Sequence, residues 1–119
     1  MTGSSNNYDL EERTVKFSEK LIYFFKRNPK NTVTLPLIDQ GIRSGTSIGA
    51  NYREANGASS KKDFQNKIFI CKKESKETMH WLRMLSRACE TVKDECRELW
   101  GEVYGYAKMF SEITSSLKK

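Results

Sequence analysis

Proline and cysteine are both scarce in this 119-residue chain, and each scarcity narrows the class of protein. The two prolines, Pro29 and Pro36, fall early, so the long stretches after them are free to form helices. The three cysteines are an odd number without a close pair, which is not the pattern of a disulfide framework. We therefore expect long helices and a reducing compartment.

Long apolar runs are also missing. The longest, Leu21–Phe25, is far too short to span a bilayer, and the polar residues at the start do not resemble a signal peptide. We therefore expect a cytoplasmic protein with no membrane contact. The length fits one domain that buries a core without cross-links, with a flexible tail over residues 1–8 and a bundle domain over residues 9–119.

Positive charge is what the chain has in excess. It carries 21 Lys and Arg against 15 Asp and Glu, which gives a net charge of +6. Such a balance favours an anionic partner, such as nucleic acid, an acidic protein or an anionic surface. A soluble protein that simply happens to be basic is the alternative.

Glycine recurs every fourth residue at Gly41, Gly45 and Gly49, where each costs a helix about 1 kcal/mol relative to alanine. The residues around them nevertheless keep helical spacing on two adjacent stripes. Small residues on two stripes predict a central helix, over about residues 34–56, which its neighbours approach closely from two sides.

Three further segments have the apolar spacing of amphipathic helices, over about residues 9–28, 60–88 and 91–119. The connections between the four segments are short, and no strand-like alternation competes with them. The sequence therefore predicts an all-α fold, an antiparallel up-down-up-down four-helix bundle. The expected N-caps are Asp9, Thr34 and either Ser59 or Ser60.

The apolar faces are wider than a closed four-helix bundle needs. Large side chains flank the inner stripes, and a small monomer rarely exposes so much apolar surface. They either cover the edges of their own helices or form a subunit interface, and we expect an interface. The expected interface residues are Trp81, Met84, Trp100 and Tyr104.

Two blocks of residues resemble a known family. The central segment reads Gln40-x-x-Arg43-Ser44-x-x-Ser47-Ile48-x-x-Asn51-x-x-Glu54. The next segment reads Ser60-x-x-Asp63-Phe64 and then Cys71-x-Lys73-Glu74-Ser75-x-Glu77-Thr78-x-x-Trp81-Leu82. Together they are similar to the bacterial four-helix bundle proteins encoded by intervening sequences in large-subunit ribosomal RNA genes. The chain departs from the usual pattern at Ala55, where relatives carry glycine.

The resemblance implies a four-helix fold and a ring-shaped homopentamer. It also implies kinship with the accessory protein of diversity-generating retroelements, a basic pentamer that binds a reverse transcriptase and nucleic acid. The partners that it suggests are copies of the same chain, RNA or DNA, and a reverse transcriptase. For the intervening-sequence proteins themselves the resemblance supplies no established activity.

Metal-binding patterns are nearly absent. Glu77-x-x-His80 is half of the carboxylate di-iron pattern of four-helix bundles. A complete site needs a second such motif, and His80 is the only histidine in the chain. We therefore expect no metal and no cofactor.

A polar set lies at helical spacing on one side of the central segment. It offers no nucleophile with a partnered base, so we expect no catalytic residue there. Arginine and glutamate are strong hydrogen-bonding partners where a helix contact buries them, so we interpret the set as structural. Its members are Arg43, Ser47, Asn51 and Glu54.

A line of basic residues follows the third segment, nearly opposite its apolar stripe. On a single helix such a line is usually a solvated face, but repetition around an oligomer would build a field that attracts phosphates. No recognised nucleic-acid motif is present, so binding should depend on shape and charge. The expected nucleic-acid-binding residues are Lys62, Lys73, Lys76, Arg83 and Arg87.

These patterns favour a non-catalytic, oligomeric four-helix bundle that binds RNA, DNA or a nucleoprotein partner through a basic surface. An accessory role beside a reverse transcriptase fits this interpretation. A protein-interaction scaffold with no nucleic-acid contact of its own is the alternative, and an enzyme is the third and weakest hypothesis.

Overall fold

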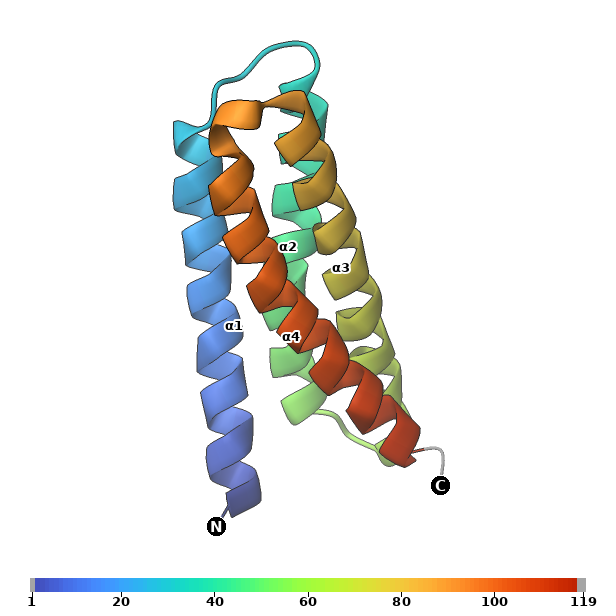
Figure 1. Cartoon of the computed structure of the whole chain (residues 1–119). Helices are drawn as coiled ribbons and strands as arrows, with labels where there is room; N and C mark the ends of the chain where they lie inside the picture. Colours follow the sequence, from blue (N-terminus) through green and yellow to red (C-terminus); the bar gives the residue numbers. More distant parts are fainter. Residues whose placement is uncertain (1, 118–119) are drawn as a thin grey trace.

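The computed structural model describes residues 2–117, which form four long helices and no strand (Figure 1). The helices are α1 (Thr2–Arg27), α2 (Thr34–Asn56), α3 (Lys61–Ala88) and α4 (Lys93–Leu117), with a short 3₁₀ turn, η1 (Glu90–Val92), before α4. The predicted all-α four-helix bundle is confirmed. Figure 1 shows the connections at alternate ends and both termini at one end, which is the up-down-up-down order. No helix within the described range has a stretch long and apolar enough to cross a bilayer.

The helix α1 begins earlier than the sequence predicts. Asp9, the expected N-cap, lies inside the helix, so that assignment is wrong. Serine and asparagine cost a helix only a few tenths of a kcal/mol each, and a helix anchored by packing further along can extend through them. The division into a tail over residues 1–8 and a domain over residues 9–119 stays a prediction.

The start of α3 follows the prediction, but the start of α2 does not. Ser60 Oγ accepts a hydrogen bond of 3.0 Å from the Asp63 N–H and so caps α3. At α2, the capping oxygen is Asn31 Oδ1, which accepts hydrogen bonds of 2.9 Å from the Val33 and Thr34 N–H groups. Thr34 is itself the first helical residue and is buried. Its hydroxyl hydrogen-bonds within the connection between α1 and α2 and does not cap the helix.

The helix α2 packs against α1 on one side and α3 on the other. The row of glycines Gly41, Gly45 and Gly49, which we call the glycine row, faces α1. A Cβ atom added at Gly49 would lie 3.3 Å from the carbonyl carbon of Thr14, and one added at Gly45 would overlap Leu21 Cδ1. These contacts agree with the predicted close approach on the α1 side. The neighbour at Gly49 is backbone, whereas at Gly45 it is the end of the flexible Leu21 side chain.

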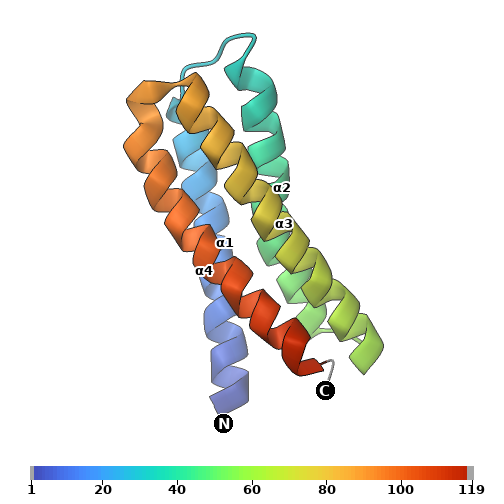
Figure 2. The same cartoon turned by 45° about the vertical axis from the view of Figure 1, so that its right-hand side comes forward.

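The helices α1 and α4 lie together at the η1 end and separate towards the termini (Figures 1 and 2). In the interior, the rings of Phe17 and Tyr106 meet edge to face at 5.6 Å. At the surface, ion pairs of 2.6 Å join the two helices. These pairs are Lys20–Glu102 and Arg27–Glu95. The long outer face of α3 is left uncovered, because α3 packs on α2 and α4 through its other sides.

Candidate functional site

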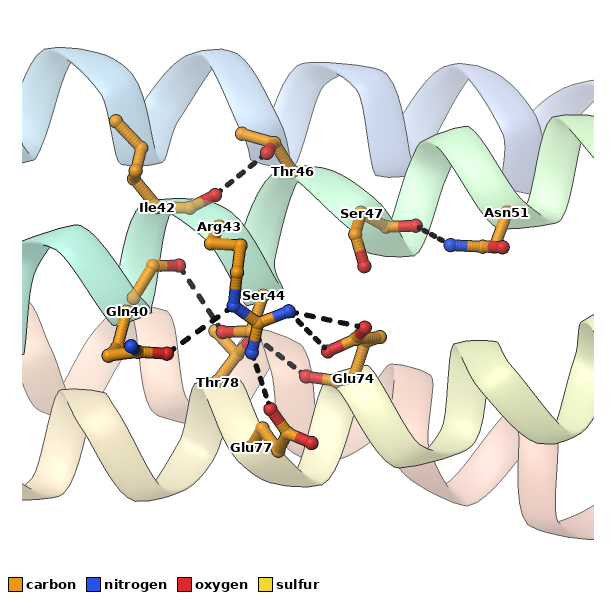
Figure 3. Close-up of polar contacts among 11 residues, drawn as sticks. Gln40, Ile42, Arg43, Ser44, Thr46, Ser47, Asn51, Glu74, Glu77 and Thr78 are labelled. Carbon is orange, nitrogen blue, oxygen red and sulfur yellow. Dashed lines mark hydrogen bonds and ion pairs between the residues drawn. The ribbon is translucent and has the colours of Figure 1, made fainter.

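Arg43 of α2 reaches across to two carboxylates of α3 (Figure 3). Its Nη2 donates to Glu77 Oε1 at 2.6 Å, and its Nη1 donates to both oxygens of Glu74 at 3.5 Å. Glu74 is buried, with 7% of its surface exposed. The hydrogen bond with Glu77 raises the pKa of the Arg43 guanidinium, so this group stays charged. The arrangement is an ionic clamp between two helices.

The other members of the polar set make separate contacts along α2. Asn51 Nδ2 donates to the Ser47 carbonyl oxygen at 2.9 Å, and Figure 3 shows this pair beyond the clamp. Glu54 Oε1 accepts a hydrogen bond of 2.7 Å from Lys67 of α3. The set therefore forms no single network. It joins α2 to α3 at two points, Arg43 and Glu54, and both side chains are more than half exposed.

The two residues of the Glu77-x-x-His80 pattern contact different neighbours. The Glu77 carboxylate is bound to Arg43, whereas His80 is exposed and lies edge-on to the Trp81 ring at 4.8 Å. Within residues 2–117 no three His, Cys, Asp or Glu side chains come together as a metal would require.

The five cations expected to bind nucleic acid are all exposed along α3. None of them forms an ion pair with another residue of the described range. α3 carries eight Lys and Arg against three Asp and Glu. Two of those acids, Glu74 and Glu77, are bound to Arg43 of α2. They therefore neutralise little of the positive charge on the outer face of α3. We call these five cations the basic ridge: Lys62, Lys73, Lys76, Arg83 and Arg87.

The four residues expected at a subunit interface lie on two different sides of the basic ridge. Trp81 and Met84 follow Glu77 by one and two turns along α3. Met84, near the end of the helix, also lines a hollow with Lys93 of α4. Trp100 and Tyr104 lie on α4 with their rings stacked at 5.4 Å and nearly parallel. Tyr104 is 47% exposed, and the other three are half-buried.

A hollow of about 340 Å³ opens between the end of α3 and the start of α4. Sequence patterns alone do not single out Lys93 and Arg97, although their spacing with Trp100 places all three on one face of α4. Only the tight η1 turn brings that face against the last turns of α3. We call this concavity the α3–α4 hollow. It is lined by Leu82, Arg83, Ser86, Lys93, Cys96, Arg97 and Trp100.

Comparison with known proteins identifies the family. A family model described as 23S rRNA-intervening sequence protein matches residues 6–112. The chain belongs to this family. A similar crystal structure is that of a protein with unknown function from the S23 ribosomal protein family of Bacteroides thetaiotaomicron VPI-5482. It is 30% identical, with a TM-score of 0.77, and the match covers 87% of this chain and 96% of that chain.

The intervening-sequence family match spans the glycine row, the Arg43 clamp, the basic ridge and the α3–α4 hollow. It confirms the resemblance inferred from the two sequence blocks. No curated protein matches the chain. The structural neighbour is itself of unknown function, so neither comparison names a catalytic activity.

Proposed function

We propose that this intervening-sequence protein is a non-catalytic bundle that binds RNA or DNA, free or within a nucleoprotein, through its basic ridge. The observation that carries the proposal is the row of exposed cations on α3 without ion-pair partners in residues 2–117. Such cations can bind phosphates, and the release of counterions drives the association. Phosphate contacts carry no sequence information, so binding should depend little on sequence.

The proposed active form is a homo-oligomer. A ring needs two different surfaces that meet head to tail, and the two sides of the basic ridge supply a candidate pair. Trp81 and Met84 would lie on one side of each junction, and Trp100 and Tyr104 on the other. The resemblance to retroelement accessory proteins suggests five copies. Five basic ridges around one particle would strengthen the field that attracts phosphates.

The cellular setting follows from the same kinship. The family description names an intervening sequence of 23S rRNA, and the resemblance to retroelement accessory proteins implies a place beside a reverse transcriptase. Either setting supplies RNA or DNA. A reverse-transcriptase complex is therefore the proposed protein partner. The three free thiols suit the reducing cytoplasm, where we place this function.

A protein-interaction scaffold without nucleic-acid contact is the second candidate. The observation that favours it is an apolar stretch on the outer surface of α1. Val15 is 39% exposed, Ile22 38% and Tyr23 62%, and the first two lie two turns apart on one helix face. Such a surface suits a protein partner better than a phosphate backbone.

Charge reversal on the basic ridge separates the two candidates. We expect the parent protein to bind RNA and DNA oligonucleotides at low salt, with affinity that falls steeply as salt rises. Replacing Lys73 and Lys76 together by Glu should weaken binding to every sequence alike, since both contact the backbone. The fold should survive, because both side chains are exposed.

The matched control reverses two exposed lysines of α1, Lys16→Glu and Lys26→Glu, which changes the net charge by the same amount. We expect it to bind nearly as well as the parent. Equal losses in both double variants would mean that net charge, not the basic ridge, governs binding. No binding by the parent at low salt would refute the nucleic-acid function and favour the scaffold.

A further inference from the structure

The α3–α4 hollow is distinctly cationic. Among its lining residues are three cations, Arg83, Lys93 and Arg97, and no acid. A neighbouring hollow shares Arg83 and Lys93 and adds Arg87, with Glu90 as its only acid. None of these four cations forms an ion pair within the described range. Cations gathered around a concave surface concentrate their field there and favour an anionic group.

The hollow also has an aromatic wall. Trp100 is half-buried and packs against the core, so its ring is held in place. Tyr104, one turn further along α4, stacks on the indole at 5.4 Å with 5° between the planes. The other α4 residues that line the hollow all precede Trp100 in the helix. Tyr104 therefore stacks on one face of the indole, and a ligand in the hollow would meet the opposite face.

We propose that the α3–α4 hollow binds one nucleotide unit of a single-stranded nucleic acid. The base stacks on the free face of Trp100, and the adjoining phosphate contacts Arg83, Lys93 and Arg97. Stacking on an aromatic plane beside a cationic groove is the general chemistry by which proteins hold single strands. The volume, about 340 Å³, lies within the usual range of small-ligand pockets.

The inference rests on the proposed function and makes it more specific. Arg83 belongs to both the basic ridge and the hollow, so a strand that follows α3 arrives at the hollow directly. A base within a duplex is already stacked between its neighbours and cannot reach Trp100. The hollow therefore selects single strands, whereas the basic ridge alone would bind duplex and single strand similarly.

This role competes with the interface role expected for Trp100. A ring that stacks a base cannot also be covered by a second subunit. If the hollow is open in the assembled particle, the subunit contact depends on Trp81, Met84 and Tyr104 instead. The two roles differ in what a Trp100 substitution changes, affinity for nucleic acid or the mass of the particle.

Indole fluorescence measures the stacking of a base on Trp100 directly. The chain has two tryptophans, and Trp81→Phe leaves Trp100 as the only one. Phenylalanine keeps an aromatic ring at this expected interface position and removes only a buried Nε1 that has no hydrogen-bond partner in the described structure. The particle mass of Trp81→Phe, compared with that of the parent, checks that assembly is kept. We expect an oligothymidylate of about 15 nucleotides to quench Trp100 in parallel with binding, and inorganic polyphosphate to bind without quenching. The same oligonucleotide in a duplex should bind without quenching.

Two substitutions test the stacking and the phosphate contact separately. Trp100→Leu should weaken oligothymidylate binding by about 5- to 150-fold and leave polyphosphate binding unchanged. Arg97→Gln, at an exposed position, should weaken binding and lower the salt slope by about 1. Arg53→Gln, an exposed arginine of α2, is the matched control and should bind as the parent does.

The outcomes separate this inference from the proposed function. Oligothymidylate binding without any change in Trp100 fluorescence would overturn the inference and leave the basic ridge intact. A Trp100→Leu variant that loses particle mass, beside an Arg97→Gln variant that binds as the parent does, would assign Trp100 to the interface and overturn it too. Failure of the parent to bind any nucleic acid would refute both proposals.

Discussion

The Thr78 hydroxyl of α3 donates a hydrogen bond of 2.8 Å to the Ser44 hydroxyl of α2, and neither side chain is exposed to solvent (Figure 3). Thr78→Val keeps the shape of the side chain but leaves Ser44 without its partner across the helix contact. Ser44 keeps only a long hydrogen bond of 3.4 Å to the Gly41 carbonyl oxygen. We therefore expect the free energy of unfolding to fall by about 1–3 kcal/mol, the usual range for a buried hydroxyl that loses its main partner. Urea unfolding measures this change.

The control is the double variant Ser44→Ala, Thr78→Val. It removes both hydroxyls, so no buried polar group is left unpaired, and its loss should be smaller than the sum of the single losses. Strictly additive losses would show that the two hydroxyls are not coupled.

Gly49→Ala tests the close contact between α1 and α2. Alanine would gain about 1 kcal/mol of helix propensity, but its methyl group would lie 3.3 Å from the Thr14 carbonyl carbon. Moving a backbone costs more than moving a flexible side chain, so we expect a lower melting temperature. Gly45→Leu, with a larger side chain in the same row, should unfold the protein or disrupt its assembly.

Gly101→Ala is the matched control for the glycine row. Gly101 lies in α4, and apart from its chain neighbours and the nearby backbone of its own helix no heavy atom lies within 4 Å of the position that its Cβ would take. There the gain in helix propensity is unopposed, and the melting temperature should rise. A rise in both alanine variants would mean that α1 and α2 are not in tight contact.

The two buried cysteines should be chemically inert. Burial raises the pKa of both Cys71 and Cys96 from an ordinary 9.0 to about 12, so both stay neutral thiols near pH 8. Cys89 is only half-buried. We expect one thiol per native chain to react rapidly with a disulfide reagent at pH 8, and three after unfolding. Rapid reaction of all three in the native state would contradict the burial.

The same pKa shifts predict the direction of alkaline destabilisation. The folded chain holds the protons of Cys71 and Cys96 more tightly than the unfolded chain does. Their contribution to stability is therefore fully present below about pH 9 and is lost as the pH rises towards 12. Urea unfolding at a series of pH values should show this decline, and a Cys71→Ala variant should show a smaller slope.

Assembly can be measured directly. We expect a particle with five times the 13.8 kDa mass of one chain at micromolar concentration. Tyr104→Glu places a charge at the most exposed of the four expected interface residues and should lower the mass. Glu at Tyr23, an exposed aromatic of α1, is the control and should leave the mass unchanged. A parent mass equal to one chain would refute the oligomer.

Features that repeat along a single helix could be predicted from sequence, whereas the particular side chains that meet between helices could not. The glycine row and the basic ridge follow from spacing alone, because helical geometry places such residues on one face. The partners of Arg43 depend on the register between α2 and α3, which no local pattern reveals. The α3–α4 hollow depends on η1, which brings Arg83 and Arg97 to the same concavity.

The glycine row that lets α1 approach α2 also bears on the order of folding. Three glycines lower the intrinsic helix propensity of α2 by about 3 kcal/mol in total, so α2 is scarcely helical in an unfolded chain. α3 contains no glycine and is joined tightly to α4. We therefore expect low φ-values in α2 and higher ones in α3, and the reverse would contradict this order. During synthesis α1 and α2 leave the ribosome first, but on this order we expect them to complete their packing only after the α3–α4 hairpin has formed.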